Sequence, residues 1–161
     1  MQTRVLCLGN DLMGDDAVGP AVARRLRQLH LPGVEVVESA ESGLRLLDYL
    51  ETPRLVVVDA VSSGDAPPGT VFVLDPQQLP LAQGVSPHYV GLREALDLGR
   101  ALGMAVADQV TILAVETADC QTVGGPMHPA VEQAVSHVVD LIRQDAAQSL
   151  LSMAAALEGI G

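Results

Sequence analysis

Apolar residues follow two alternating patterns along this chain. Short continuous runs rich in Val, Leu and Ile predict strands at Arg4 to Gly9, Val34 to Ser39, Arg54 to Ala60, Thr70 to Leu74 and Gln109 to Val115. Apolar residues at helical spacing predict helices over Val18 to Leu29, Leu44 to Leu50, Leu92 to Leu102 and Val131 to Ile142. This alternation indicates parallel crossovers with helices on both faces of a sheet. The expected fold is a three-layer α/β/α sandwich around a twisted, mostly parallel sheet of about five strands.

One strand is expected to break the parallel order. The run from Thr70 to Leu74 follows the turn-forming segment Gly64 to Gly69 too closely for a crossover helix, so it is predicted to pair antiparallel. No repeat or linker divides residues 1–145, which are expected to form a single α/β domain. Residues 146–161 contain no clear signals that start or stop a secondary-structure element, and they are expected to form either a helical extension or a frayed tail.

Composition and charge narrow the class of partner. The 161 residues carry 20 acidic and 9 basic side chains, a net charge of −11, which disfavours nucleic acid and anionic membranes. No apolar run reaches the roughly 20 residues of a membrane span. Cys7 and Cys120 form no CxxC motif, and no charged segment introduces a signal peptide. We therefore expect a cytoplasmic protein, and a monomer.

Acidic residues follow two of the predicted strands. Asp15 and Asp16 lie in the glycine-rich loop after the first strand, and Asp59 ends the third. In an open α/β sheet the carboxyl ends of the strands form the ligand-binding crevice, so Asp16 and Asp59 are expected to face one cleft if these strands are neighbours. His88 follows Pro87 at a predicted helix start. Two carboxylates and an imidazole suit Zn, Ni, Co or Mn with coordination positions left for water or substrate.

Each of these residues also has a purely structural explanation. An Asp at the start of a helix more often caps it, Asp59 could cap the following turn, and a lone histidine is more often no ligand. His128 at a later helix start is expected to be a capping or contact residue. Other classes fit poorly: the glycine spacing is not G-x-G-x-x-G, there is no G-x-S-x-G nucleophile motif, and a phospho-receiver domain would need a lysine that the chain lacks.

Three motifs together resemble the nickel-iron hydrogenase maturation endopeptidases. They are Gly9-Asn10-x-Leu12-x-x-Asp15-Asp16-x-x-Gly19, Val58-Asp59-Ala60 and Ser86-Pro87-His88-x-x-Gly91-Leu92, and the similarity extends from about Arg4 to Asp145. The resemblance implies an enzyme that removes the C-terminal extension of a hydrogenase large-subunit precursor after nickel insertion. It also implies that Asp16, Asp59 and His88 contact the metal, as catalytic and metal-contacting residues. Nickel would be carried by the substrate, and zinc or another divalent ion could take its place.

The loop after the second strand departs from the family pattern. A Gly- and Thr-rich segment is usual there, whereas this chain has Glu38 to Gly43 and keeps only Gly43 clearly. We expect Glu38, Glu41 and Gly43 to contact the precursor, with the two glutamates favouring cationic residues. Which hydrogenase is matured stays open, as does the role of the metal in catalysis or recognition. The alternatives are a metal-dependent hydrolase of another substrate and a non-catalytic metal-sensing or chaperone module on the same fold.

Overall fold

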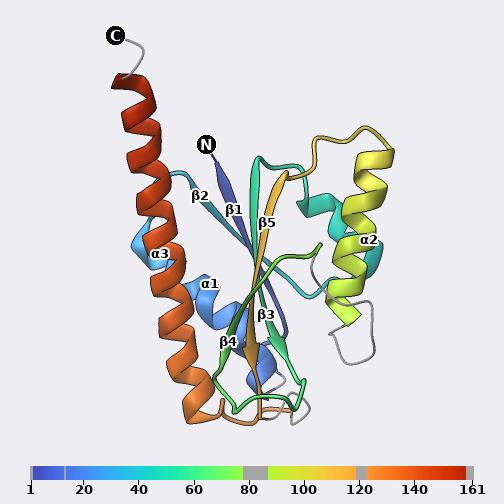
Figure 1. Ribbon diagram of the computed structural model, residues 1–161. Helices are drawn as coiled ribbons and strands as arrows, with labels where there is room; N and C mark the ends of the chain where they lie inside the picture. The colour runs from blue at the N-terminus through green and yellow to red at the C-terminus, as the bar shows by residue number, and fades with distance from the viewer. Residues whose placement is uncertain (1, 13, 78–86, 119–122, 159–161) are drawn as a thin grey trace.

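The computed structural model describes residues 2–12, 14–77, 87–118 and 123–158, and its described part contains one five-stranded sheet with helices on both faces (Figure 1). The strands are β1 (Thr3–Leu8), β2 (Val34–Ser39), β3 (Arg54–Val61), β4 (Val71–Leu74) and β5 (Gln109–Glu116). The helices are α1 (Val18–Leu29), α2 (Pro87–Ala101) and α3 (Pro129–Glu158), with 3₁₀ segments η1 (Gly14–Ala17) and η2 (Gly43–Tyr49). Each predicted strand lies within one residue of an observed strand at both ends, and the predicted α/β class is confirmed.

The strand order is β2-β1-β3-β5-β4, and all pairs are parallel except β4 with β5. The antiparallel pairing predicted for the fourth strand is therefore confirmed. β1 and β3 are direct neighbours, with Cys7 opposite Val58. Consequently the loops that follow β1, β2, β3 and β5 all leave the same end of the sheet, which we call the carboxyl end (the lower end in Figure 1). The opposite end, where β3 and β5 begin, is the amino end.

Two apolar clusters hold the three layers together. α1 and α3 cover one face of the sheet, where Val5, Val58 and Val115 pack against residues such as Val22 and Val138. α2 and η2 cover the other face, over Leu6, Val57 and Ile112. Strands buried on both faces are continuous apolar runs, which is why β1 and β3 carry no polar alternation. Within the described residues, no helix is both long enough and apolar enough to cross a membrane.

Two elements differ from the expectation or extend it. The segment from Leu44 to Leu50, predicted as a helix from its leucine spacing, falls in the 3₁₀ segment η2 and its C-cap residue Leu50; Leu46 and Leu50 are buried while Leu44 is exposed. Leu44, Leu47 and Leu50 are three residues apart, and this spacing fits the period of a 3₁₀ helix as well as one face of an α-helix. The stretch after Asp145 continues α3 as helix through Glu158, far past the end of the sheet (Figure 1).

Candidate functional site

The loop between β1 and α1 brings Asp16 back to the carboxyl end of β1. Gly9 has a φ of +141°, and a Cβ atom built on it would lie 2.2 Å from the carbonyl oxygen of Asp16. The Asn10 N–H donates a hydrogen bond to this carbonyl at 3.1 Å. The side chain of Asn10 accepts the Leu12 N–H at 2.9 Å. Glycine is required at position 9 because the backbone of η1 passes directly over it, and this close approach fixes the place of Asp16.

Asp59 lies near the end of the central strand β3 and is 1% exposed. Its Oδ1 atom accepts the Ala60 N–H at 2.8 Å, whereas Oδ2 has no hydrogen-bond partner among the described residues. Burial raises the pKa of Asp59 from 3.8 to about 8; the Ala60 hydrogen bond opposes this rise, and the charge of Asp16 adds to it. The structure thus brings the two carboxylates into electrostatic contact and leaves one buried oxygen available for a ligand.

His88 lies in the first turn of α2, and its side chain is outside the described part of the structure. The backbone nevertheless places this turn at the carboxyl end. A Cβ atom on Gly91 would lie 2.6 Å from the Cα atom of Gly43, so the helix begins directly against the segment that follows β2. Among the described side chains no group of three His, Cys, Asp or Glu residues could hold a metal ion. The convergence of His88 with Asp16 and Asp59 stays a prediction.

Asp15 has a structural role that its neighbour Asp16 does not share. The side chain of Asp15 is 1% exposed and accepts the N–H groups of Ala118 at 2.7 Å and His128 at 2.8 Å. It therefore ties the loop after β1 to the segments that leave β5 and enter α3. It does not cap α1, which begins after Ala17 without a side-chain cap. The imidazole Nδ1 of His128 accepts the Ala130 N–H at 3.1 Å, which confirms the predicted capping role of His128.

Sequence reasoning missed Glu116, the last residue of β5. Its carboxylate is buried and accepts the N–H groups of Ser63 at 3.1 Å and Gly64 at 3.0 Å. The Ser63 hydroxyl donates a third hydrogen bond at 2.6 Å. Glu116 thereby fixes the loop that follows Asp59. Its signal in the sequence was the one that marked Asp59, an acidic residue at the end of an apolar strand.

The loop expected to contact the precursor already pairs its glutamates within the chain. Glu38 forms an ion pair with Arg27, and Glu41 forms one with Arg45 at 3.2 Å. Gly43 has a φ of +61° and makes the close approach to Gly91 described above. A cationic residue of a partner would therefore have to compete with an arginine at either glutamate.

Cys7 lies opposite Glu38 on the neighbouring strand and is fully buried, as the sequence predicted. Burial raises the pKa of its thiol to about 12.

The two remaining histidines of the described residues lie at or on helices. His137 is exposed on α3, as the sequence indicated, whereas His30 is exposed in the turn that ends α1, where it has a φ of +48°. Cys120 lies outside the described residues.

Comparison with known proteins identifies relatives of this arrangement. The family model described as hydrogenase maturation protease (HycI) matches residues 20–145. The hydrogenase 2 maturation protease of Escherichia coli is 30% identical over 148 residues, which cover 84% of this chain and 90% of that protein. The E. coli endopeptidase HybD superposes with a TM-score of 0.75 at 25% identity, covering 92% of this chain and 94% of HybD. HybD from Thermococcus kodakarensis superposes with a TM-score of 0.73 at 26% identity, covering 91% of this chain and 99% of that protein.

Fold and site together define a class of α/β protein, an open sheet that carries two acidic residues, Asp16 and Asp59, at the carboxyl end of its parallel strands. The chain belongs to the hydrogenase maturation protease family, because the family model covers most of its length and a relative at 30% identity spans nearly all of it. The family match includes Asp59 and His88. It begins after Asp16, whose position rests on the geometry of Gly9 and η1.

Proposed function

We propose that this chain removes the C-terminal extension of a nickel-iron hydrogenase large-subunit precursor after nickel has been inserted. Asp16, Asp59 and His88 would contact the nickel ion that the precursor carries, and the ion would thus belong to the substrate. The observation that carries the proposal is the buried Oδ2 atom of Asp59, which has no partner among the described residues and lies under the influence of the Asp16 charge. An acceptor left without a partner in the interior is costly unless a ligand satisfies it.

The donor set at the carboxyl end fits a divalent ion. Carboxylate oxygens from Asp16 and Asp59, with an imidazole from His88, are ligands that nickel and zinc accept. An ion held there would act as a Lewis acid on the scissile carbonyl. The chain itself supplies rigid placement: Gly9 fixes Asp16, and Glu116 fixes the loop after Asp59.

The free protein should hold a divalent ion only weakly. Asp59 carries a proton at neutral pH because burial raises its pKa to about 8. A cation must displace this proton, which lowers apparent affinity at pH 7 by about tenfold relative to the ionised carboxylate. Three ligands without a thiolate also leave the coordination shell incomplete. Both factors favour recognition of an ion already bound in the precursor over a resident metal.

The test is a cleavage assay with defined precursors. Nickel-loaded and nickel-free large-subunit precursor are incubated with the protein, and loss of the C-terminal segment is followed by mass spectrometry. We expect cleavage only of the loaded precursor, and loss of cleavage in Asp16→Asn and His88→Ala with thermal stability nearly unchanged. Asp48→Asn, an exposed acidic residue of η2, is the matched control and should process normally.

Three outcomes would contradict the proposal. Tight binding of the loaded precursor without cleavage would indicate a metal-sensing or chaperone module. Equal cleavage of nickel-free precursor would show that the ion is not recognised. Tight stoichiometric nickel or zinc binding without precursor, measured by calorimetry, would favour a resident metal instead.

A further inference from the structure

The strand β4 at the edge of the sheet is too short to cover β5. It pairs from Val71, opposite Val115, to Leu74, opposite Ile112. β5 begins three residues earlier, at Gln109, and this first part pairs with β3 on one side only. Among the described residues, the amino end of β5 is therefore an unpaired strand edge, at the opposite end of the sheet from Asp16 and Asp59.

The register identifies the backbone groups that point outward there. The N–H of Glu116 donates to Thr70 O at 2.9 Å, and Glu116 O accepts the Gly69 N–H at 2.8 Å, so Glu116 bonds toward the β4 side. The backbone groups of successive residues in a strand point alternately to the two neighbouring strands, so every second residue bonds to the same side. Val110 precedes Glu116 by an even number of residues, and its N–H and C=O therefore also point toward the β4 side. Neither group has a backbone partner among the described residues.

Proline explains why β4 stops before this position. Continuing the register of Leu74 opposite Ile112 would place Pro76 opposite Val110. Proline has no N–H to donate to the ladder. The chain instead turns at Asp75, whose Oδ1 accepts the Gln77 N–H at 2.8 Å. The sequence thus leaves one rung of the ladder open.

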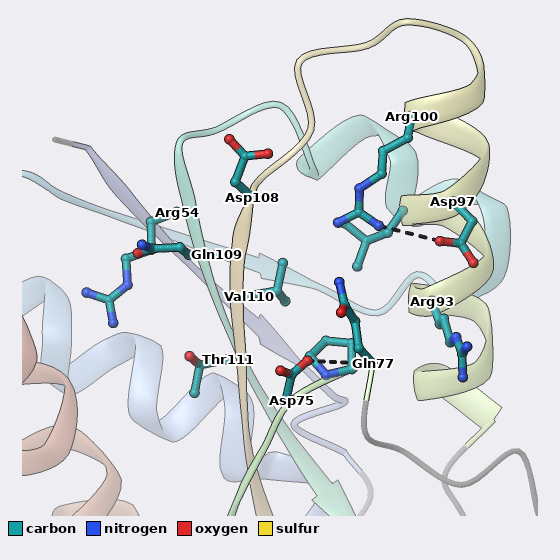
Figure 2. A pocket seen from close by; sticks show the side chains of 12 residues that line it. Arg54, Asp75, Gln77, Arg93, Asp97, Arg100, Asp108, Gln109, Val110 and Thr111 are labelled. Carbon is teal, nitrogen blue, oxygen red and sulfur yellow. Dashed lines mark hydrogen bonds and ion pairs between the residues drawn. The ribbon is translucent and has the colours of Figure 1, made fainter.

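A space flanks the open rung on each face of the sheet. On the α2 side lies a groove of about 660 Å³. Figure 2 shows Arg100 and Gln77 extending into it from α2 and from the turn after β4, with Val110 beside them on β5. On the α3 side lies a smaller, apolar space of about 200 Å³, lined by Leu113, Leu141 and Ile142 among others. Arg54 and Thr111 line both spaces.

The groove on the α2 side carries opposite charges on its two walls. Arg100 stands on α2 and pairs with Asp97 of the same helix at 3.4 Å, in an exposed and therefore weak pair. Asp108 stands on the segment before β5 and has no ion pair within the described part of the chain. A ligand that carries both charges would complement the two walls.

We propose that the open edge of β5 binds an extended peptide segment of a partner protein as an added strand. Successive side chains of a strand point to opposite faces, so the peptide's alternate residues meet different spaces. Running along the line of β4, the peptide places an acidic residue opposite Val110, toward Arg100. The next residue is apolar and enters the space beside α3, and the one after is basic and faces Asp108. This inference does not depend on proteolysis at the carboxyl end.

Hydrogen exchange tests the open rung directly. In the ¹⁵N-labelled protein, we expect the amide of Val110 to exchange much faster than that of Ile112, which lies one rung along in the β4 ladder. Addition of the peptide acetyl-Glu-Leu-Lys-Ser-amide, whose first residue, glutamate, lies opposite Val110 beyond the end of β4, should slow exchange at Val110 and leave Ile112 unchanged. Equal protection of both amides in the free protein would overturn the proposal.

Matched peptides and variants test the recognition. Methylation of the glutamate nitrogen in the peptide removes the donor to Val110, and affinity measured by NMR titration should fall about tenfold. The reordered peptide acetyl-Lys-Leu-Glu-Ser-amide should bind more weakly. Arg100→Glu should weaken binding up to about fivefold, whereas Arg143→Glu, which removes a similar pair with Asp140 on α3, should not.

Three results would refute the proposed partner. The methylated peptide could bind as well as the parent, or no peptide could perturb Val110 at millimolar concentration. Alternatively, protection of Val110 could rise with protein concentration alone, which would show that a second copy of the chain occupies the edge.

Discussion

The buried carboxyl of Asp59 should make the stability of this protein fall as the pH rises above neutral. Burial raises its pKa from 3.8 to about 8, so the folded protein holds this proton where the unfolded chain has lost it. Stability from this group is fully present below pH 4 and is lost as the pH rises through 8. Between pH 5 and the folded-state pKa of about 8, the unfolding free energy declines over about 3 pH units at about 1.36 kcal/mol per unit. Asp59 should therefore lower the unfolding free energy by about 4 kcal/mol between pH 5 and pH 9.

Urea denaturation at several pH values between 5 and 9 measures this effect. Asp59→Asn cannot ionise, so its unfolding free energy should lack the decline and should exceed the wild-type value at pH 9. At pH 5 the variant should be slightly less stable, because an amide at this site replaces the protonated carboxyl. Asp48→Asn, an exposed control, should follow the wild-type profile. If the difference between Asp59→Asn and wild type stays within about 0.5 kcal/mol over the whole range, the reasoning about burial is wrong.

Four further predictions concern the loops and the ion. Asp15→Asn should lower the unfolding free energy by about 1 to 3 kcal/mol in urea denaturation, because the amide NH₂ would face a backbone N–H. Gly91→Ala should cost about 1 to 3 kcal/mol and slow processing, since its Cβ would lie 2.6 Å from the Cα atom of Gly43; unchanged melting would contradict this contact. Charge reversal of Glu38 and Glu41 to Lys should slow capture of the precursor at low salt by up to about fivefold for each glutamate, and rates equal to wild type would exclude selection by charge. Calorimetry of the free protein should show nickel affinity rising with pH from 6 to 9, because Asp59 loses its proton over this range. An affinity that does not change with pH would show that Asp59 does not bind the ion.

Local patterns in the sequence predicted the strands and Asp59 because both depend on neighbouring residues. A continuous apolar run such as Val56 to Val58 predicts a strand buried on both faces, and an acidic residue directly after such a run stands out as a candidate for a specific role. The same logic applied to Glu116, but its partners, Ser63 and Gly64, precede it by 53 and 52 positions. The role of a buried acid depends on such partners, which no local pattern encodes.

Contacts between residues far apart in the sequence determine the roles of Glu38, Asp15 and Asp16, which the sequence left open or misjudged. The pairing of Glu38 with Arg27 follows from β2 lying beside α1, and the sequence alone offered Glu38 as a free charge for a substrate. Asp15 and Asp16 are chemically identical neighbours, and only the approach of Ala118 and His128 separates their roles. The leucines of η2 show a limit of another kind, because a short repeat of three residues fits two helix types.

The hydrogen bonds of Asp15 have a consequence for how the protein is made. Its carboxylate oxygens accept hydrogen bonds from residues 103 and 113 positions later in the chain, so the loop that carries Asp16 gains these two anchors only after the segment up to His128 has been synthesised and folded. A nascent chain that ends before β5 holds the first carboxylate of the site without these two hydrogen bonds. The loop therefore obtains its full set of contacts only when nearly the whole domain exists.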